Sequence, residues 1–170
     1  ALLAMAAIFS RVLAGSFAQL ARAADKARDT MLVPKTALET PPLEIHTLGA
    51  YALRQPAQRI GKVNDQVREL ARDMLRSMYT AKGIGLAAPQ VAVYQQLLVI
   101  DLDLENAATP PLVLINPEIT AASAGLDPYE EGCLSIPGVY LDVVRPTAIE
   151  LSYRDEMGRP RKMKADGLMA

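Results

Sequence analysis

The sequence predicts an α+β fold, in which one long amphipathic helix precedes several antiparallel strands. Residues 64–81 carry apolar side chains at helical spacing, and the chain after residue 95 consists of short apolar runs separated by turn residues. Hydrophobic residues make up 51% of the 170-residue chain, which favours a folded domain of ordinary size over a disordered chain.

The helix predicted at residues 64–81 has signals at both ends. Asn64 or Asp65 can cap the first turn with a side-chain oxygen, and Gly83 stands where a glycine commonly ends a helix. One face is charged and is expected to be solvated. The face expected to pack on the core consists of Val67, Leu70, Ala71, Met74, Leu75 and Met78.

Short apolar runs predict the strands. The clearest are residues 96–101 and 112–115, and Asn116–Pro117 is expected to end the second of them. Residues 166–170 resemble the first turn of a helix that Asp166 could cap. Further strands are expected at residues 119–122, 139–144, 148–153 and 161–165, with a hairpin turn at 155–158 before the last one.

Three regions follow from these patterns. Residues 1–29 are rich in Ala and Leu and predict a helical extension, residues 30–47 predict a proline-containing linker, and residues 48–170 form the domain. The arginines of the extension follow its apolar run, which argues against a secretory signal but is compatible with organellar import. A plain amphipathic helix is the preferred interpretation, and no run reaches the roughly 18 apolar residues of a membrane span.

The net charge and the single cysteine and histidine limit the functions that the chain can have. The 18 basic and 19 acidic residues give a formal net charge of −1, which provides no electrostatic argument for nucleic acid or an anionic membrane as a partner. Cys133 is the one cysteine, so no disulfide can form within the chain and a reducing cytoplasm is the expected location. His46 is the one histidine, so this chain alone cannot complete chemistry that needs two.

The segment Gly83–Gln90 is the first candidate for a functional motif. Its two glycines resemble a phosphate loop, but the third glycine of that fingerprint is missing and the segment follows a helix instead of a strand. Its backbone is expected to pair with an extended peptide as an added strand. Gln90 could donate a hydrogen bond to a developing oxyanion, although alone the segment also fits an ordinary tight turn.

The segment Glu130–Gly138 surrounds the single cysteine and leaves three interpretations open. Cys133 could be a small buried hydrophobe, which is the commoner case. It could be a nucleophile, for which His46 in the linker is the only candidate base. It could also be a thiolate ligand of Zn²⁺ or Fe²⁺, in a site that needs further ligands.

The two segments together resemble peptide deformylases. Gly83–Gln90 matches the family's Gly-x-Gly-x-Ala-Ala-x-Gln motif, and Glu131–Ser135 matches its Glu-Gly-Cys-Leu-Ser motif. The resemblance runs from about residue 43 to residue 170 and is closest to the bacterial and plastid type. It implies antiparallel sheets around a helix and hydrolysis of the formyl group from the N-terminal formyl-methionine of new polypeptides.

The family's third motif, Gln-His-Glu-x-x-His on a central C-terminal helix, is absent from these 170 residues. The sequence is interpreted as a fragment that stops before this motif and is inactive as written. A protein that binds formyl-methionine or N-terminal peptides without hydrolysis is the alternative. A thiol hydrolase that uses Cys133 is a weaker one.

The resemblance also implies roles for individual residues. Cys133 would hold Fe²⁺, or Zn²⁺, Ni²⁺ or Co²⁺, together with ligands that are absent here. Gln90 and the backbone N–H of Leu134 would receive the oxyanion. Formylated nascent peptides are the expected partners, met at the ribosome by a monomer that binds neither nucleic acid nor membrane. The residues expected to bind substrate are Ile84, Gly85, Glu131 and Gly132, and Arg145 is the expected ion-pair partner of Glu131.

Overall fold

The structure is a computed structural model that describes residues 30–170, so the helix expected at residues 1–29 lies outside the described residues. Residues 30–47 form neither a helix nor a strand. Their backbone is nevertheless held by the following helix, because the N–H groups of Leu38 and Leu43 donate to the hydroxyls of Thr80 and Ser77. A short 3₁₀ helix, Tyr51–Arg54, follows.

The predicted amphipathic helix is α2, Asp65–Thr80, and its first turn is capped by Asn64, whose side chain accepts a hydrogen bond from Val67 N–H. The far end is a Schellman motif, in which Lys82 N–H donates to Tyr79 C=O and Gly83 N–H donates to Met78 C=O. Lys82 takes the left-handed conformation at φ 56°. The expectation that Gly83 is the capping glycine is therefore wrong.

Five antiparallel strands form the main sheet in the order β1-β2-β3-β6-β7. They are β1 (Gly85–Ala87), β2 (Leu97–Ile100), β3 (Leu112–Ala122), β6 (Ala148–Arg154) and β7 (Pro160–Asp166). The expected end of the second strand at Asn116–Pro117 is wrong, because β3 continues through it. Asn116 takes a left-handed conformation at a register shift against β6, and the strand expected at 119–122 is the second half of β3.

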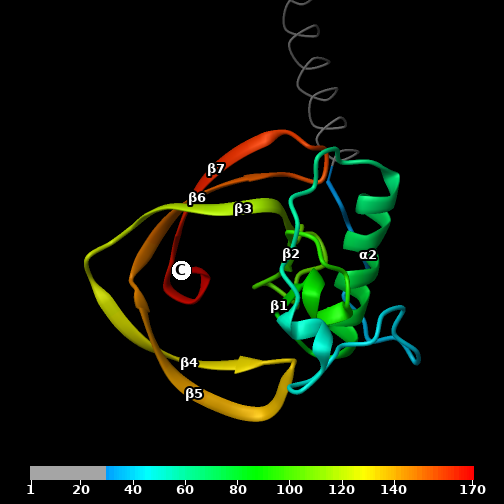
Figure 1. Cartoon of the computed structure of the whole chain (residues 1–170), viewed down its shortest axis with the longest axis horizontal. Helices are drawn as coiled ribbons and strands as arrows, with labels where there is room; N and C mark the ends of the chain where they lie inside the picture. The colour runs from blue at the N-terminus through cyan, green and yellow to red at the C-terminus, as the bar shows by residue number, and fades with distance from the viewer. Residues whose placement is uncertain (1–29) are drawn as a thin grey trace, which may run out of the picture. The chain divides into compact units, whose positions relative to one another are not determined.

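The core lies where α2 packs against β1 and β2 (Figure 1). Met74, Leu75 and Met78 on α2 are fully buried, as the apolar stripe predicts. Leu97, Val99, Val113 and Ile115 of the sheet are also buried. A second cluster is built around Leu114, Leu151 and Ala165, with Leu98, Ile100, Leu112, Ile149, Tyr153, Met163 and Met169 packed against it.

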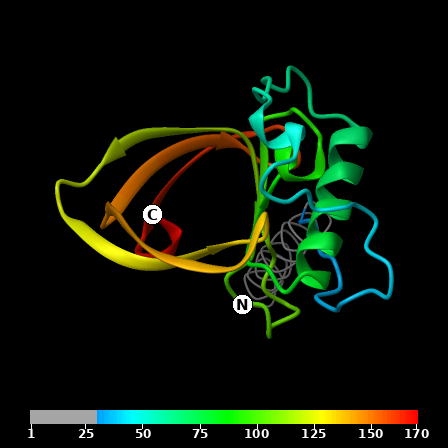
Figure 2. The same ribbon diagram turned by 60° about the horizontal axis from the view of Figure 1, so that its bottom comes forward.

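A separate two-stranded hairpin is formed by β4 (Leu126–Cys133) and β5 (Ile136–Pro146). Figures 1 and 2 show most of this hairpin away from α2, while the turn between β4 and β5 reaches toward β1. The sequence predicts only residues 139–144 of β5 and none of β4. Many of its apolar side chains are exposed, including Leu126, Tyr140, Leu141 and Val144.

The last described residues correct one expectation. Residues 167–169 form a short 3₁₀ helix, but the Asp166 side chain makes no capping hydrogen bond to it. One α-helix with antiparallel strands in the described residues confirms the α+β class. None of the helices in residues 30–170 is long and apolar enough to cross a membrane.

Candidate functional site

The first motif runs from the end of α2 through β1 and into a 3₁₀ helix, Ala88–Val91. Within it, the backbone N–H of Ala87 donates to Gln90 Oε1 over 2.9 Å. This bond fixes the orientation of the Gln90 amide, because an N–H donor must face the amide oxygen and not the NH₂ group. The NH₂ group of Gln90 is thereby turned toward the β4–β5 hairpin.

The two motifs meet through this amide group. Gln90 Nε2 lies 3.0 Å from Ser135 Oγ and 3.7 Å from Cys133 Sγ. Ser135 is only 4% exposed, so its hydroxyl is shielded from solvent and Gln90 supplies a partner. The sequence predicts Gln90 and Cys133 as site residues but assigns Ser135 no role, although Ser135 completes the contact between the motifs.

Cys133 is a free and exposed thiol at the end of β4, so the interpretation as a buried hydrophobe is wrong. A two-residue turn, Leu134 and Ser135, joins it to β5 at Ile136. This turn places the thiol at the tip of the hairpin, beside the NH₂ group of Gln90.

The segment around His46 joins the two motifs through its backbone. His46 N–H donates to Gln90 C=O over 2.8 Å, and Leu48 N–H donates to Ser135 C=O over 2.7 Å. The sequence places His46 in a linker and gives the segment no part in the site. No side-chain signal could have revealed this bridge, because every residue except proline carries a backbone N–H.

Two motif glycines allow close packing. A Cβ atom on Gly83 would lie 2.5 Å from Leu134 Cδ1, and one on Gly132 would lie 2.8 Å from Tyr140 Cε1. Gly83 belongs to the first motif and Leu134 to the second, so a larger residue at position 83 would force the Leu134 side chain to move. Gly132 leaves space beside β4 for the Tyr140 ring.

The predicted ion pair between Glu131 and Arg145 is confirmed. Arg145 Nε donates to Glu131 Oε1 over 2.8 Å and Nη2 donates to Oε2 over 2.9 Å, which is a bidentate contact across the hairpin. These hydrogen bonds hold the pKa of Glu131 below its usual range and raise the pKa of Arg145. The side chains are 32% and 48% exposed, so the pair stabilises the fold by at most about 1 kcal/mol.

The first motif also supplies a sheet edge. Among residues 30–170, β1 pairs with β2 on one side only and ends the order of the sheet. Gly85 lies on this edge strand, and Ile84 just before it is 39% exposed. An edge strand with free N–H and C=O groups can accept an extended peptide as an additional strand.

The described residues provide one soft metal ligand and not a complete metal site. Residues 30–170 contain no cluster of three or more His, Cys, Asp and Glu side chains that could hold a metal ion. Structural and catalytic zinc sites in proteins use at least three protein ligands. Cys133 alone therefore does not fit a bound metal without further ligands.

Comparison with known proteins agrees with this geometry. Residues 42–170 match the family model described as polypeptide deformylase. Over 158 residues, the chain is 98% identical to a peptide deformylase from Synechococcus sp. (strain CC9902), which covers 93% of this chain and 79% of that protein. A peptide deformylase from Parasynechococcus marenigrum (strain WH8102) is 88% identical over 158 residues, and this match also covers 93% of this chain and 79% of that protein.

Solved structures give the same result. A peptide deformylase from Synechococcus elongatus in complex with actinonin matches with a TM-score of 0.81 and 56% identity, over 82% of this chain and 76% of that one. A peptide deformylase from Legionella pneumophila matches with a TM-score of 0.71 and 37% identity, over 75% and 74%. The chain therefore belongs to the polypeptide deformylase family, whose members are metal-dependent hydrolases.

Proposed function

We propose that this chain carries the oxyanion-binding and peptide-binding parts of an enzyme that removes the formyl group from the N-terminal formyl-methionine of new polypeptides. The observation that carries the proposal is that Gln90, Cys133 and Ser135 lie together. Gln90 Nε2 is 3.0 Å from Ser135 Oγ and 3.7 Å from Cys133 Sγ. Family membership supports the same reaction class.

Gln90 and Leu134 act as donors to the oxyanion in this proposal. Amide hydrolysis places negative charge on the carbonyl oxygen in the transition state, and preorganised N–H donors stabilise that charge. The Gln90 amide is held by Ala87 N–H, so it loses little freedom when its NH₂ group binds the oxyanion. The backbone N–H of Leu134, in the turn beside Cys133, is the second donor.

The free edge of β1 binds the substrate peptide in extended form. Ile84 and Gly85 provide backbone groups for this pairing, and the small Gly85 leaves room beside the strand. Glu131 and Gly132 lie on β4 just before the cysteine, where Arg145 makes its bidentate contact with Glu131 across the hairpin. This contact supports the end of the hairpin that carries the Cys133 thiol.

Cys133 is proposed as one ligand of the family's metal, with Fe²⁺ as the first choice and Zn²⁺, Ni²⁺ or Co²⁺ as substitutes. The metal would supply an activated water. Because the described residues provide one ligand and the whole chain has one histidine, the 170-residue chain alone is expected to be inactive. Formylated nascent peptides are the proposed partners, met at the ribosome by a monomeric enzyme.

The test is formate release from a formyl-methionine peptide, measured under anaerobic conditions with Fe²⁺ or Ni²⁺. The 170-residue chain is compared with a form extended to the length of its curated relatives, of which it spans 79%. We expect activity only in the extended form. In that form Gln90→Leu should lower kcat by about 100-fold or more. The matched control is Gln96→Leu, because Gln96 is a half-buried glutamine that bonds to Ala57 C=O instead.

Other outcomes would change the assignment. Activity of the 170-residue chain would show that Cys133 works with ligands outside this proposal. A kcat for Gln90→Leu close to that of Gln96→Leu would remove Gln90 from the oxyanion site. If neither form releases formate but both bind the peptide, the protein is a binder of formylated N-termini and not a hydrolase.

A further inference from the structure

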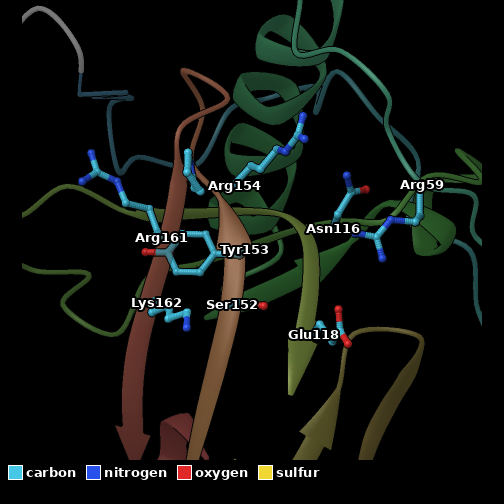
Figure 3. A pocket seen from close by; sticks show the side chains of 9 residues that line it. Arg59, Asn116, Glu118, Ser152, Tyr153, Arg154, Arg161 and Lys162 are labelled. Carbon is cyan, nitrogen blue, oxygen red and sulfur yellow. The ribbon is translucent and has the colours of Figure 1, made fainter. Parts of the chain in front are cut away.

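A pocket of about 360 Å³ opens on the sheet where β3, β6 and β7 lie together (Figure 3). It shares no lining residue with the proposed deformylase site. Four of its lining residues are cationic, namely Arg59, Arg154, Arg161 and Lys162, whereas Glu118 is the single acid. The lining thus has a formal charge of +3, from four positive charges and one negative, on a chain whose net charge is −1.

The cations of this pocket are only partly neutralised by the protein. Arg161 is held by Asp155, with contacts of 2.8 Å to Oδ2. Arg154 donates weakly to Gly61 C=O over 3.4 Å. Arg59 and Lys162 form no ion pair with any residue in the described part of the chain. Two cations therefore remain available to a ligand.

The pocket floor is polar. Asn116 is 7% exposed; its Oδ1 accepts from Ile60 N–H and its Nδ2 donates to Ile60 C=O, each over 2.8 Å. This bond pair fixes the chain beside Arg59 to the bulge of β3. The half-buried Ser152, which pairs with Lys162 across β6 and β7, adds a hydroxyl to the floor. The four cations come from the segment before α2 and from β6 and β7.

We propose that this pocket binds a phosphate group. Guanidinium and ammonium groups from different elements line this pocket, and a tetrahedral anion has oxygens that accept hydrogen bonds from several directions. The volume exceeds what the anion alone needs and falls in the range of small-molecule sites, which leaves space for an organic part. A phosphorylated small molecule and the phosphate backbone of an RNA offer the same chemistry.

The experiment is an NMR titration of the ¹⁵N-labelled 170-residue chain at about 50 mM salt, where surface charges are weakly screened. The probes are inorganic phosphate, a nucleoside monophosphate and a short single-stranded RNA. Saturable shifts at Ser152, Arg154 and Lys162 are expected. If the monophosphate binds as tightly as the RNA, the natural source is a free metabolite. If the RNA binds far more tightly with a steep salt dependence, the source is a nucleic acid.

Variants make the test specific to the pocket. Arg59→Gln and Lys162→Gln should each weaken binding by about ten-fold, the loss expected for one charge-assisted contact. The matched control is Lys164→Gln, which removes the same charge from the same strand but pairs with Glu150 outside the pocket, and it should change binding by less than about two-fold. Thermal unfolding checks that all variants remain folded. The absence of saturable shifts, or equal weakening by all three variants, would overturn the proposal.

Discussion

Lys35, Tyr79 and Asp101 form a buried polar network whose loss should destabilise this fold. Lys35 Nζ and Tyr79 Oη each lie 2.7 Å from Asp101 Oδ2, and the backbone N–H of Asp103 donates to Oδ1 over 3.0 Å. The side chains of Lys35 and Asp101 are 5% and 2% exposed. The network ties the segment before the domain to α2 and to the end of β2.

Asp101→Asn removes the counter-charge and keeps the shape. The Lys35 ammonium then remains buried beside a neutral amide, with Asp103 C=O as its other acceptor at 2.7 Å. Loss of one partner from a buried ion pair lowers the free energy of unfolding by about 3–5 kcal/mol. Lys35→Met should cost less, about 1–3 kcal/mol, because Asp101 keeps its donors from Tyr79 and Asp103.

The assay is urea unfolding followed by circular dichroism at pH 7. The double variant Lys35→Met/Asp101→Asn should lose less stability than the sum of the single variants, with a coupling of about 1 kcal/mol or more. The matched control is Lys164→Met. Lys164 and Glu150 form an ion pair whose side chains are 83% and 51% exposed, so its loss should cost at most about 1 kcal/mol.

The same network predicts a pH dependence. Burial raises the pKa of Asp101, but hydrogen bonds from Lys35, Tyr79 and the Asp103 backbone outweigh it and hold this pKa below its ordinary value. A carboxyl group whose pKa is lowered by folding stabilises the folded state at pH values above its unfolded pKa of about 3.9. This stabilisation is lost as the pH falls through the pKa of the folded state. The stability gap between wild type and Asp101→Asn should therefore shrink between pH 7 and pH 3. A constant gap, or one below about 1 kcal/mol at pH 7, would refute this reasoning.

Two further predictions concern packing. Gly83→Ala should lower the free energy of unfolding by about 1–3 kcal/mol, because its Cβ would lie 2.5 Å from Leu134 Cδ1. In a double-mutant cycle measured by urea unfolding, Leu134→Ala should recover much of this loss, and strictly additive effects would argue against the contact. Backbone amides of the β4–β5 hairpin should exchange with deuterium faster than those of β2 and β3, whose side chains are far more buried; equal protection would contradict this.

Local patterns predict the parts of this fold that local physics decides. The α2 helix shows its apolar stripe and its Asn64 cap in the sequence, and β2 shows an apolar run. The last strand, β7, is indicated by the hairpin turn before it. β4 shows no such signal, because Leu126–Cys133 contains a proline and three acidic residues and owes its strand conformation to pairing with β5. Asn116–Pro117 carries a turn signal, but pairing of β3 with β6 on either side turns it into a bulge.

The candidate site divides in the same way. The resemblance of the two motifs to those of the family indicates Gln90 and Cys133, whereas residue type alone leaves each with a structural alternative. Their separation of 3.7 Å depends instead on groups that carry no sequence signal, namely the backbone N–H groups of His46 and Leu48, which hold the two motifs together. The sequence predicts that Gly83 ends the helix, but the structure gives it a different role. It stands at a helix end, where a turn explains a glycine, yet Lys82 makes that turn and the glycine leaves space for Leu134. A glycine in a motif can thus be required by the packing of two motifs against each other, and not by the backbone conformation at its own position.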